Sequence, residues 1–120
     1  MLRPAIVAII CLASSAVAAG NAKQGETVFG RCAMCHTADK DGGNGLGPNL
    51  FGVVGRKAAS LSGFSYSPAL KGTNIVWTDD KLKAWLTAPQ KMVPGTRMVF
   101  TGLKNAQEID DVIAYLHTKK

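Results

Sequence analysis

The 120-residue sequence is short of acidic residues and has no cluster of aromatic ones. Eight Asp and Glu stand against fourteen Lys and Arg, which gives a formal net charge of +6. A basic surface favours acidic partners or steering by an anionic field. The basic residues are nevertheless spread along the chain, without a dense block or an interleaved aromatic platform, and this pattern argues against nucleic-acid binding. Internal repeats and disordered tracts are also lacking, so we expect one domain.

The first eighteen residues differ from the rest in composition. A short positive start is followed by residues 4–17, which are nearly all apolar or small, and an A-x-A pattern ends at Ala18. This is the layout of a secretory signal peptide cleaved after Ala18, and Cys11 would be removed with it. The apolar run is shorter than the roughly 20 residues that span a bilayer comfortably. A retained membrane anchor is the alternative. We expect the mature domain to comprise residues 19–120.

Hydrophobic spacing and capping residues predict an all-α domain of about four to five helices with long loops. The last helix, after Asn105, is the clearest, because its apolar residues recur with the helical period. The Gly-rich stretch 39–48 is a loop, and Ile75–Trp77 is too short to carry a sheet. A small domain with long loops needs something to organise its core, and a bound cofactor would do so. Helices are expected at 22–33, from Ser67 to Gly72, from Thr78 to Ala88 before Pro89, and from Asn105 to the lysines at the C-terminus.

Cys32, Cys35 and His36 form a C-x-x-C-H run, the spacing of c-type haem attachment. Two cysteines three residues apart on a helical turn can reach neighbouring positions on one porphyrin edge. Each thiol would then bond to one vinyl group, and His36 would be held against the iron as its proximal ligand.

Three other interpretations of the motif are possible. A structural disulfide is permitted in an exported protein. A thioredoxin-like redox pair requires an α/β setting, which the predicted elements lack. A closed zinc site needs four ligands, and the mature chain offers only Cys32, Cys35, His36 and the distant His117. Haem attachment is favoured over all three.

The sixth iron ligand of an electron carrier is usually Met or His. Met34 lies within the attachment motif, on the wrong side, whereas Met92 and Met98 share the loop after Pro89. The turn Pro94–Thr96 could deliver the thioether of Met98 to the iron. Spacing alone favours Met98 only slightly over Met92. An iron left open on this side would instead suit an enzyme or a gas sensor.

From Gly25 to Leu116 the chain resembles the class I cytochromes c, the mitochondrial and related bacterial type. The run Pro94–Phe100 resembles the axial-methionine loop of that family, which implies that Met98 is the ligand. The run Gly47–Leu50 resembles the turn after the haem motif, which implies that the Pro48 carbonyl accepts a hydrogen bond from His36. Such a bond fixes the ring and tunes the iron.

The resemblance also implies contacts with the haem propionates. Arg56 would lie near one propionate, and Tyr66, Trp77 and Thr96 would donate hydrogen bonds. Contacts between the first and last helices are implied for Gly25 and Phe29 with Val112 and Tyr115. Trp85, Phe64 and Leu70 depart from residues common in the family, and these departures change the hydrogen bonding on which the redox potential depends.

The resemblance implies a soluble periplasmic electron carrier and not an enzyme. It would hold one covalent haem c with its iron and pass single electrons between membrane complexes by outer-sphere transfer. Expected partners are membrane or soluble redox proteins with acidic docking surfaces, such as a quinol-oxidising complex, terminal oxidase, reaction centre or dehydrogenase. A monomer without nucleic acid is expected. Candidates for a basic rim around the haem edge are Lys40, Lys57, Lys91, Arg97 and Lys104.

Overall fold

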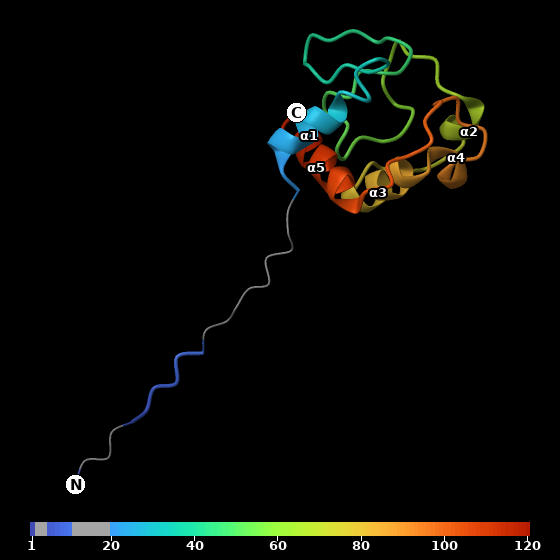
Figure 1. Cartoon of the computed structure of the whole chain (residues 1–120). Coiled ribbons are helices and arrows are strands. Elements are labelled where there is room, and N and C mark those ends of the chain that lie inside the picture. The colour runs from blue at the N-terminus through green and yellow to red at the C-terminus, as the bar shows by residue number, and fades with distance from the viewer. Residues whose placement is uncertain (2–4, 11–19) are drawn as a thin grey trace.

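The computed structural model describes residues 1, 5–10 and 20–120 and contains five helices joined by long loops (Figure 1). The all-α prediction is confirmed: the described residues form no named strand, and Lys57 and Val76 make a single antiparallel bridge. None of the described helices has the length and apolar character needed to cross a membrane. Cys11 and the predicted cleavage site at Ala18 lie outside the described residues. The helices are α1 (Ala22–Phe29), α2 (Pro68–Lys71), α3 (Asp79–Thr87), α4 (Pro89–Met92) and α5 (Ala106–His117).

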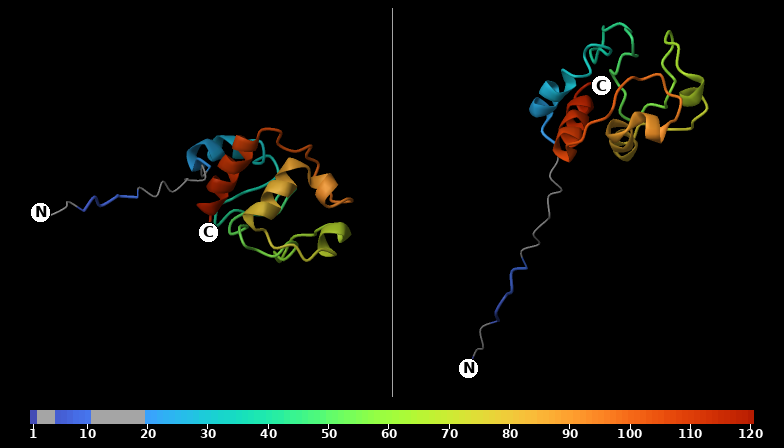
Figure 2. Two further views of the ribbon diagram at one scale, coloured as in Figure 1. Left: turned by 90° about the horizontal axis from the view of Figure 1, so that it is seen from below. Right: turned by 45° about the vertical axis from the view of Figure 1, so that its right-hand side comes forward.

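Helices α1 and α5 come from opposite ends of the domain and lie side by side in every view (Figures 1 and 2). They approach closely because Gly25 has no side chain; a methyl group there would lie 1.9 Å from the carbonyl oxygen of Asp111. The rings of Phe29 and Tyr115 pack together with centroids 5.2 Å apart and planes tilted by 44°. The buried carboxylate of Asp111 accepts a hydrogen bond of 2.8 Å from the Asn21 backbone N–H. The contact expected between the first and last helices is therefore present.

Helix α3 begins and ends where its sequence predicts. The Thr78 side chain accepts a hydrogen bond from the Lys81 backbone N–H as the N-cap, and two aspartates occupy the first turn. Ala88, which precedes Pro89, is extended and ends the helix. The chain then turns back into helical geometry as α4, which the sequence analysis did not predict. Proline at the first position of a helix loses no intrahelical hydrogen bond, so Pro89 both ends α3 and starts α4.

Helices α2 and α1 differ in how closely their bounds match the predicted ones. Helix α2 has the Ser67 cap, the proline at its first position and Gly72 at its end, as expected. Helix α1 is shorter than the predicted 22–33, because residues 30–35 continue as hydrogen-bonded turns.

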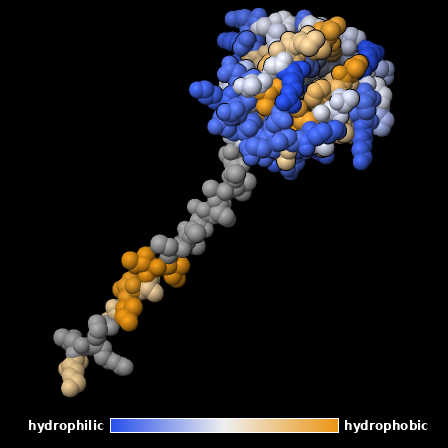
Figure 3. Space-filling model, in the orientation of Figure 1, coloured by the Kyte–Doolittle hydropathy of each residue, from blue (hydrophilic) through white to orange (hydrophobic). Residues whose placement is uncertain are grey.

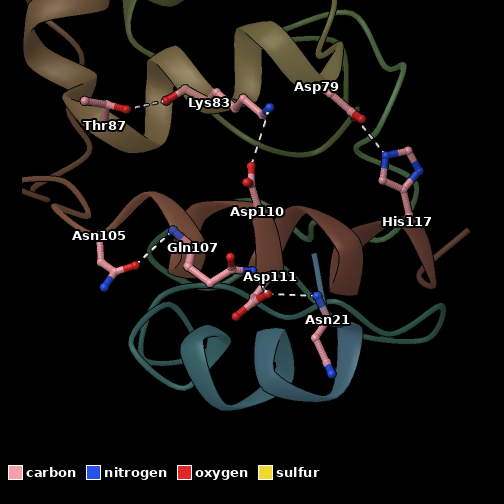
Figure 4. A network of polar contacts seen from close by, with 9 residues as sticks. All are labelled: Asn21, Asp79, Lys83, Thr87, Asn105, Gln107, Asp110, Asp111 and His117. Atoms are coloured by element: carbon pink, nitrogen blue, oxygen red, sulfur yellow. Dashed lines mark hydrogen bonds and ion pairs between the residues drawn. The ribbon is translucent and has the colours of Figure 1, made fainter. Parts of the chain in front are cut away.

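Two polar side-chain pairs join α3 to α5 on the outside of the domain (Figure 4). His117 Nε2 lies 2.7 Å from Asp79 Oδ1, and Lys83 Nζ lies 3.5 Å from Asp110 Oδ1. Behind these pairs the apolar faces of the two helices enter one core that includes Leu82, Trp85 and Leu86 of α3 and Ile109, Val112, Ile113 and Leu116 of α5. Phe29 of α1 belongs to the same core, so the three helices together form one wall of a central cavity.

Candidate functional site

A partly open, mainly apolar cavity occupies the centre of the domain. It encloses about 740 Å³ of empty space, part of it open to solvent. Four helices contribute to its lining, for example through Phe29 of α1, Leu70 of α2, Trp85 of α3 and Leu116 of α5. Figure 3 shows apolar residues gathered on one face of the folded part, with hydrophilic residues around them.

Seven of the nine predicted site residues line this cavity. Cys35 and Thr96 do not: Cys35 is exposed at the outer end of its turn, and Thr96 is buried in the loop after α4. The seven that meet at the cavity are Cys32, His36, Pro48, Arg56, Tyr66, Trp77 and Met98. They come from segments far apart in sequence, so the fold alone brings them together.

The C-x-x-C-H run lies on turns that continue the direction of α1. The backbone N–H groups of Cys35 and His36 both donate to the carbonyl of Cys32, at 3.1 and 2.9 Å. With this helical winding Cys32 and His36 reach the cavity lining, and Cys35 is left exposed. Because Phe29 accepts hydrogen bonds from Cys32 and Ala33 in the same way, the position of the run follows directly from that of α1.

The ring of His36 is oriented by the backbone of the following loop. Its Nδ1 lies 2.7 Å from the carbonyl oxygen of Pro48. A carbonyl oxygen can only accept, so Nδ1 carries the proton and Nε2 is left with a free lone pair. Burial lowers the pKa of His36 below its usual value, although the bond to Pro48 opposes this change. A neutral imidazole with an unprotonated Nε2 is the form that binds a metal.

Two residues of the run Gly47–Leu50, to which the sequence analysis gave no role of their own, hold this arrangement in place. Gly47 lies against the imidazole, where a methyl group would sit 2.3 Å from Cε1 of His36. Asn49 secures the loop: its Nδ2 donates to the carbonyls of Asp39 and Gly42 at 2.9 and 2.7 Å. The Gly-rich composition was the available signal for Gly47, whereas the bonds of Asn49 depend on how the loop folds.

Met98 and Met92 occupy different surroundings. Met98 lines the cavity and Met92 does not, although both methionines pack against the hydrophobic core. The two methionines that spacing left nearly equivalent are therefore separated by the tertiary structure. Met34 lies in the hydrogen-bonded turns of residues 30–35, called the attachment turn below, and is 87% exposed.

The polar residues of the lining gather at one part of the cavity. Arg56 donates to the carbonyls of Phe51 and Asn49, both at 3.1 Å. Burial is the main reason that the pKa of Arg56 is lowered, and the nearby Tyr66 opposes that effect. A half-buried guanidinium near a tyrosine hydroxyl suits an anionic group, such as a carboxylate at the edge of a cofactor.

The thiols do not support the three competing interpretations. Cys32 and Cys35 are both free in the structure. Burial raises the pKa of Cys32, with Arg31 opposing and Cys35 adding to the shift; a reactive redox thiol normally has a lowered pKa. No group of three or more His, Cys, Asp or Glu side chains among the described residues could hold a zinc ion.

The donor set and the cavity fit a haem. Cofactor sites are typically concave and mainly apolar, with a few polar groups that orient the ligand, and the lining of the present cavity has this character. Cys32, His36 and Met98 all line it, and the bond from Nδ1 to Pro48 leaves Nε2 of His36 with a free lone pair. Imidazole with thioether is the ligand pair of electron-transfer haems.

Comparisons with known proteins agree with this fit. The model of the family "Cytochrome c" matches residues 22–120. A cytochrome c of Gibberella zeae is 50% identical over 101 residues, covering 83% of this chain and 95% of that protein. A cytochrome c2 of Rhodomicrobium vannielii is 45% identical over 112 residues, covering 93% and 90%. The solved structure of cytochrome cH from Methylobacterium extorquens superimposes with a TM-score of 0.78 at 48% identity, covering 83% of this chain and all of that one.

Proposed function

The chain belongs to the cytochrome c family, and on that basis we propose that it is a periplasmic electron carrier whose haem iron is ligated by His36 and Met98. Proteins of this family are electron carriers and not enzymes, and they hold a covalently attached haem c with its iron. The observation that carries the proposal is that Cys32, His36 and Met98 line one apolar cavity.

The bound haem supplies a one-electron ferric/ferrous couple. The residues of this chain determine how it is held and tuned. Cys32 and Cys35 provide the thioether attachment, and the bond from His36 to Pro48 fixes the imidazole and raises its basicity as a ligand. The neutral thioether of Met98 and the apolar lining favour the form with the smaller net charge, which raises the reduction potential.

Arg56, Tyr66 and Trp77 are proposed to face the propionates, because they form the polar part of the lining. Thr96 is proposed as a fourth donor on the family resemblance. It lies close in sequence to Met98 but outside the lining of the cavity.

The surface that contacts redox partners is proposed to lie around the attachment turn and the loop that carries Met98. The Gly47 N–H donates to the Cys35 carbonyl, so the loop that contains Leu46 is joined to the turn that carries Met34. Leu46 is 85% exposed, Met34 is 87% exposed, and Val99, next to Met98, is fully exposed. An apolar centre with exposed basic residues such as Arg97 around it suits brief contact with a redox partner that carries acidic groups.

Export to the periplasm is proposed from the first eighteen residues, whose layout is that of a cleaved signal peptide. The N-terminus of the secreted protein, read by mass spectrometry, tests this part separately. A chain beginning at residue 19 is expected, and a secreted chain that retains residues 1–18 would contradict it.

The ligand assignment is tested by a matched pair of variants, Met98→Leu and Met92→Leu. Leucine nearly conserves the volume of methionine, so neither change opens a large cavity. Met98→Leu should abolish the absorption band of iron–sulfur ligation in the ferric protein, whereas Met92→Leu should keep it. The mass of the mature chain should exceed that of the polypeptide by one haem. A colourless secreted chain with free thiols would refute the proposal.

A further inference from the structure

The side chain of Gln90 bridges α4 to the loop that carries Met98. Its Nε2 donates two hydrogen bonds, to the carbonyl of Thr96 at 2.8 Å and to the carbonyl of Met98 at 3.1 Å. A carboxamide nitrogen has two hydrogens, so these bonds use its full capacity as a donor. The two acceptors lie one on each side of Arg97, and one of them belongs to Met98 itself.

The loop has few other bonds at this point. Residues 97–102 are all described, and within them the backbone makes one hydrogen bond to itself, from Phe100 N–H to the Met98 carbonyl. Firmer anchors lie outside this stretch: Thr96 N–H donates to Val93, and Leu103 N–H donates to Leu86. The side chains of Arg97 and Val99 are exposed and provide no burial to hold it.

We propose that Gln90 is a positioning residue for Met98, which holds the backbone of the loop so that the thioether stays directed into the cavity. The inference rests on the proposed role of Met98 as axial ligand. The helix that carries Gln90 is itself secured, because Pro89 is fully buried and the Val93 side chain is buried at its other end. Gln90 therefore connects the loop to a rigid support, and its uncharged amide does so independently of pH.

The test uses the haem-loaded protein and measures how well imidazole competes with the axial methionine in the ferric state. Gln90→Ala removes both bonds and keeps a good helix former. Gln90→Glu places a carboxylate against two carbonyl oxygens. Gln90→Lys restores a donor that can reach both. Gln24→Ala, at an exposed glutamine of α1, is the matched control.

Imidazole should bind about fivefold tighter to Gln90→Ala, since two partly exposed hydrogen bonds are lost. Binding should be tighter still for Gln90→Glu, and within about twofold of the parent for Gln90→Lys and Gln24→Ala. Hydrogen exchange should accelerate at the amides of residues 97–100 in Gln90→Ala, while the midpoint of global unfolding stays close to that of the control. A purely structural residue would shift the midpoint without this local change.

The assignment of Met98 as ligand and the positioning role of Gln90 can be refuted separately. If Met98→Leu keeps the iron–sulfur band, Met98 is not the ligand and the proposed function needs revision. If Met98→Leu loses the band but Gln90→Ala matches Gln24→Ala in imidazole affinity and loop exchange, the positioning role of Gln90 is overturned. If Gln90→Ala binds imidazole more tightly than the parent and Gln90→Lys does so as well, the hydrogen-bonding account is overturned too.

Discussion

Replacing Gly25 by alanine should force α1 away from α5 and destabilise the whole domain. In an isolated helix the same change is favourable by about 1 kcal/mol, because alanine is the better helix former. Here the added methyl carbon would lie 1.9 Å from the carbonyl oxygen and 2.5 Å from the carbonyl carbon of Asp111. These atoms belong to the backbone of α5 and cannot rotate away as a side chain would.

The size of the effect follows from that overlap. Close contacts between a carbon and a carbonyl oxygen lie at about 3.3–3.6 Å, so the helices must separate by more than 1 Å. The contact between the rings of Phe29 and Tyr115 and the bond from Asn21 to Asp111 both depend on the present spacing. Overpacking of this kind costs about 1–3 kcal/mol, and more where the neighbour is rigid. With about 3 kcal/mol for the overlap and a gain of about 1 kcal/mol from the better helix former, we expect a net loss of about 2 kcal/mol.

Denaturant unfolding of the haem-loaded protein measures this loss. Gly43→Ala is the matched control, because a methyl group at Gly43 meets no atom within 4 Å, and it should change the free energy of unfolding by less than about 0.5 kcal/mol. If Gly25→Ala proved as stable as Gly43→Ala, the close approach of the two helices would be incorrect.

Three further predictions address the loops and the surface. Asn49→Ala should lower the free energy of unfolding by about 2 kcal/mol, because its amide bonds to Asp39 and Gly42 are lost; an unchanged unfolding midpoint would show that the loop does not need them. Ala59→Gly should raise the free energy of unfolding by up to about 1 kcal/mol, because Ala59 has a φ of +58° that glycine adopts without strain. The neighbouring Ala58→Gly should lower it in the same denaturation assay, and a gain in both variants would rule out relief of strain. Turnover with a membrane oxidase should fall about tenfold or more as ionic strength rises, since the exposed basic residues steer the encounter; a flat response would remove the steering.

The helices were largely predictable because their signals are local. Thr78 and Asn105 cap backbone groups two or three residues away, and Val112 and Leu116 are buried because they recur with the helical period. The C-x-x-C-H spacing indicates its chemistry in the same way. The short helix α4 was missed because Pro89 was interpreted only as a stop signal, although proline also favours a helix start.

The sequence by itself determined the class of fold, the attachment motif and the family of the chain. Spacing hardly separates Met92 from Met98, and the choice of Met98 rested on the family resemblance. Only the packing of the loop shows that Met98 reaches the cavity lining and Met92 does not, although both methionines touch the core. The same holds for Gln90, whose bonds depend on where the loop returns past α4. Local signals act over a few residues, whereas a cavity lined from Phe29 to Leu116 exists only once the two ends of the chain have packed together.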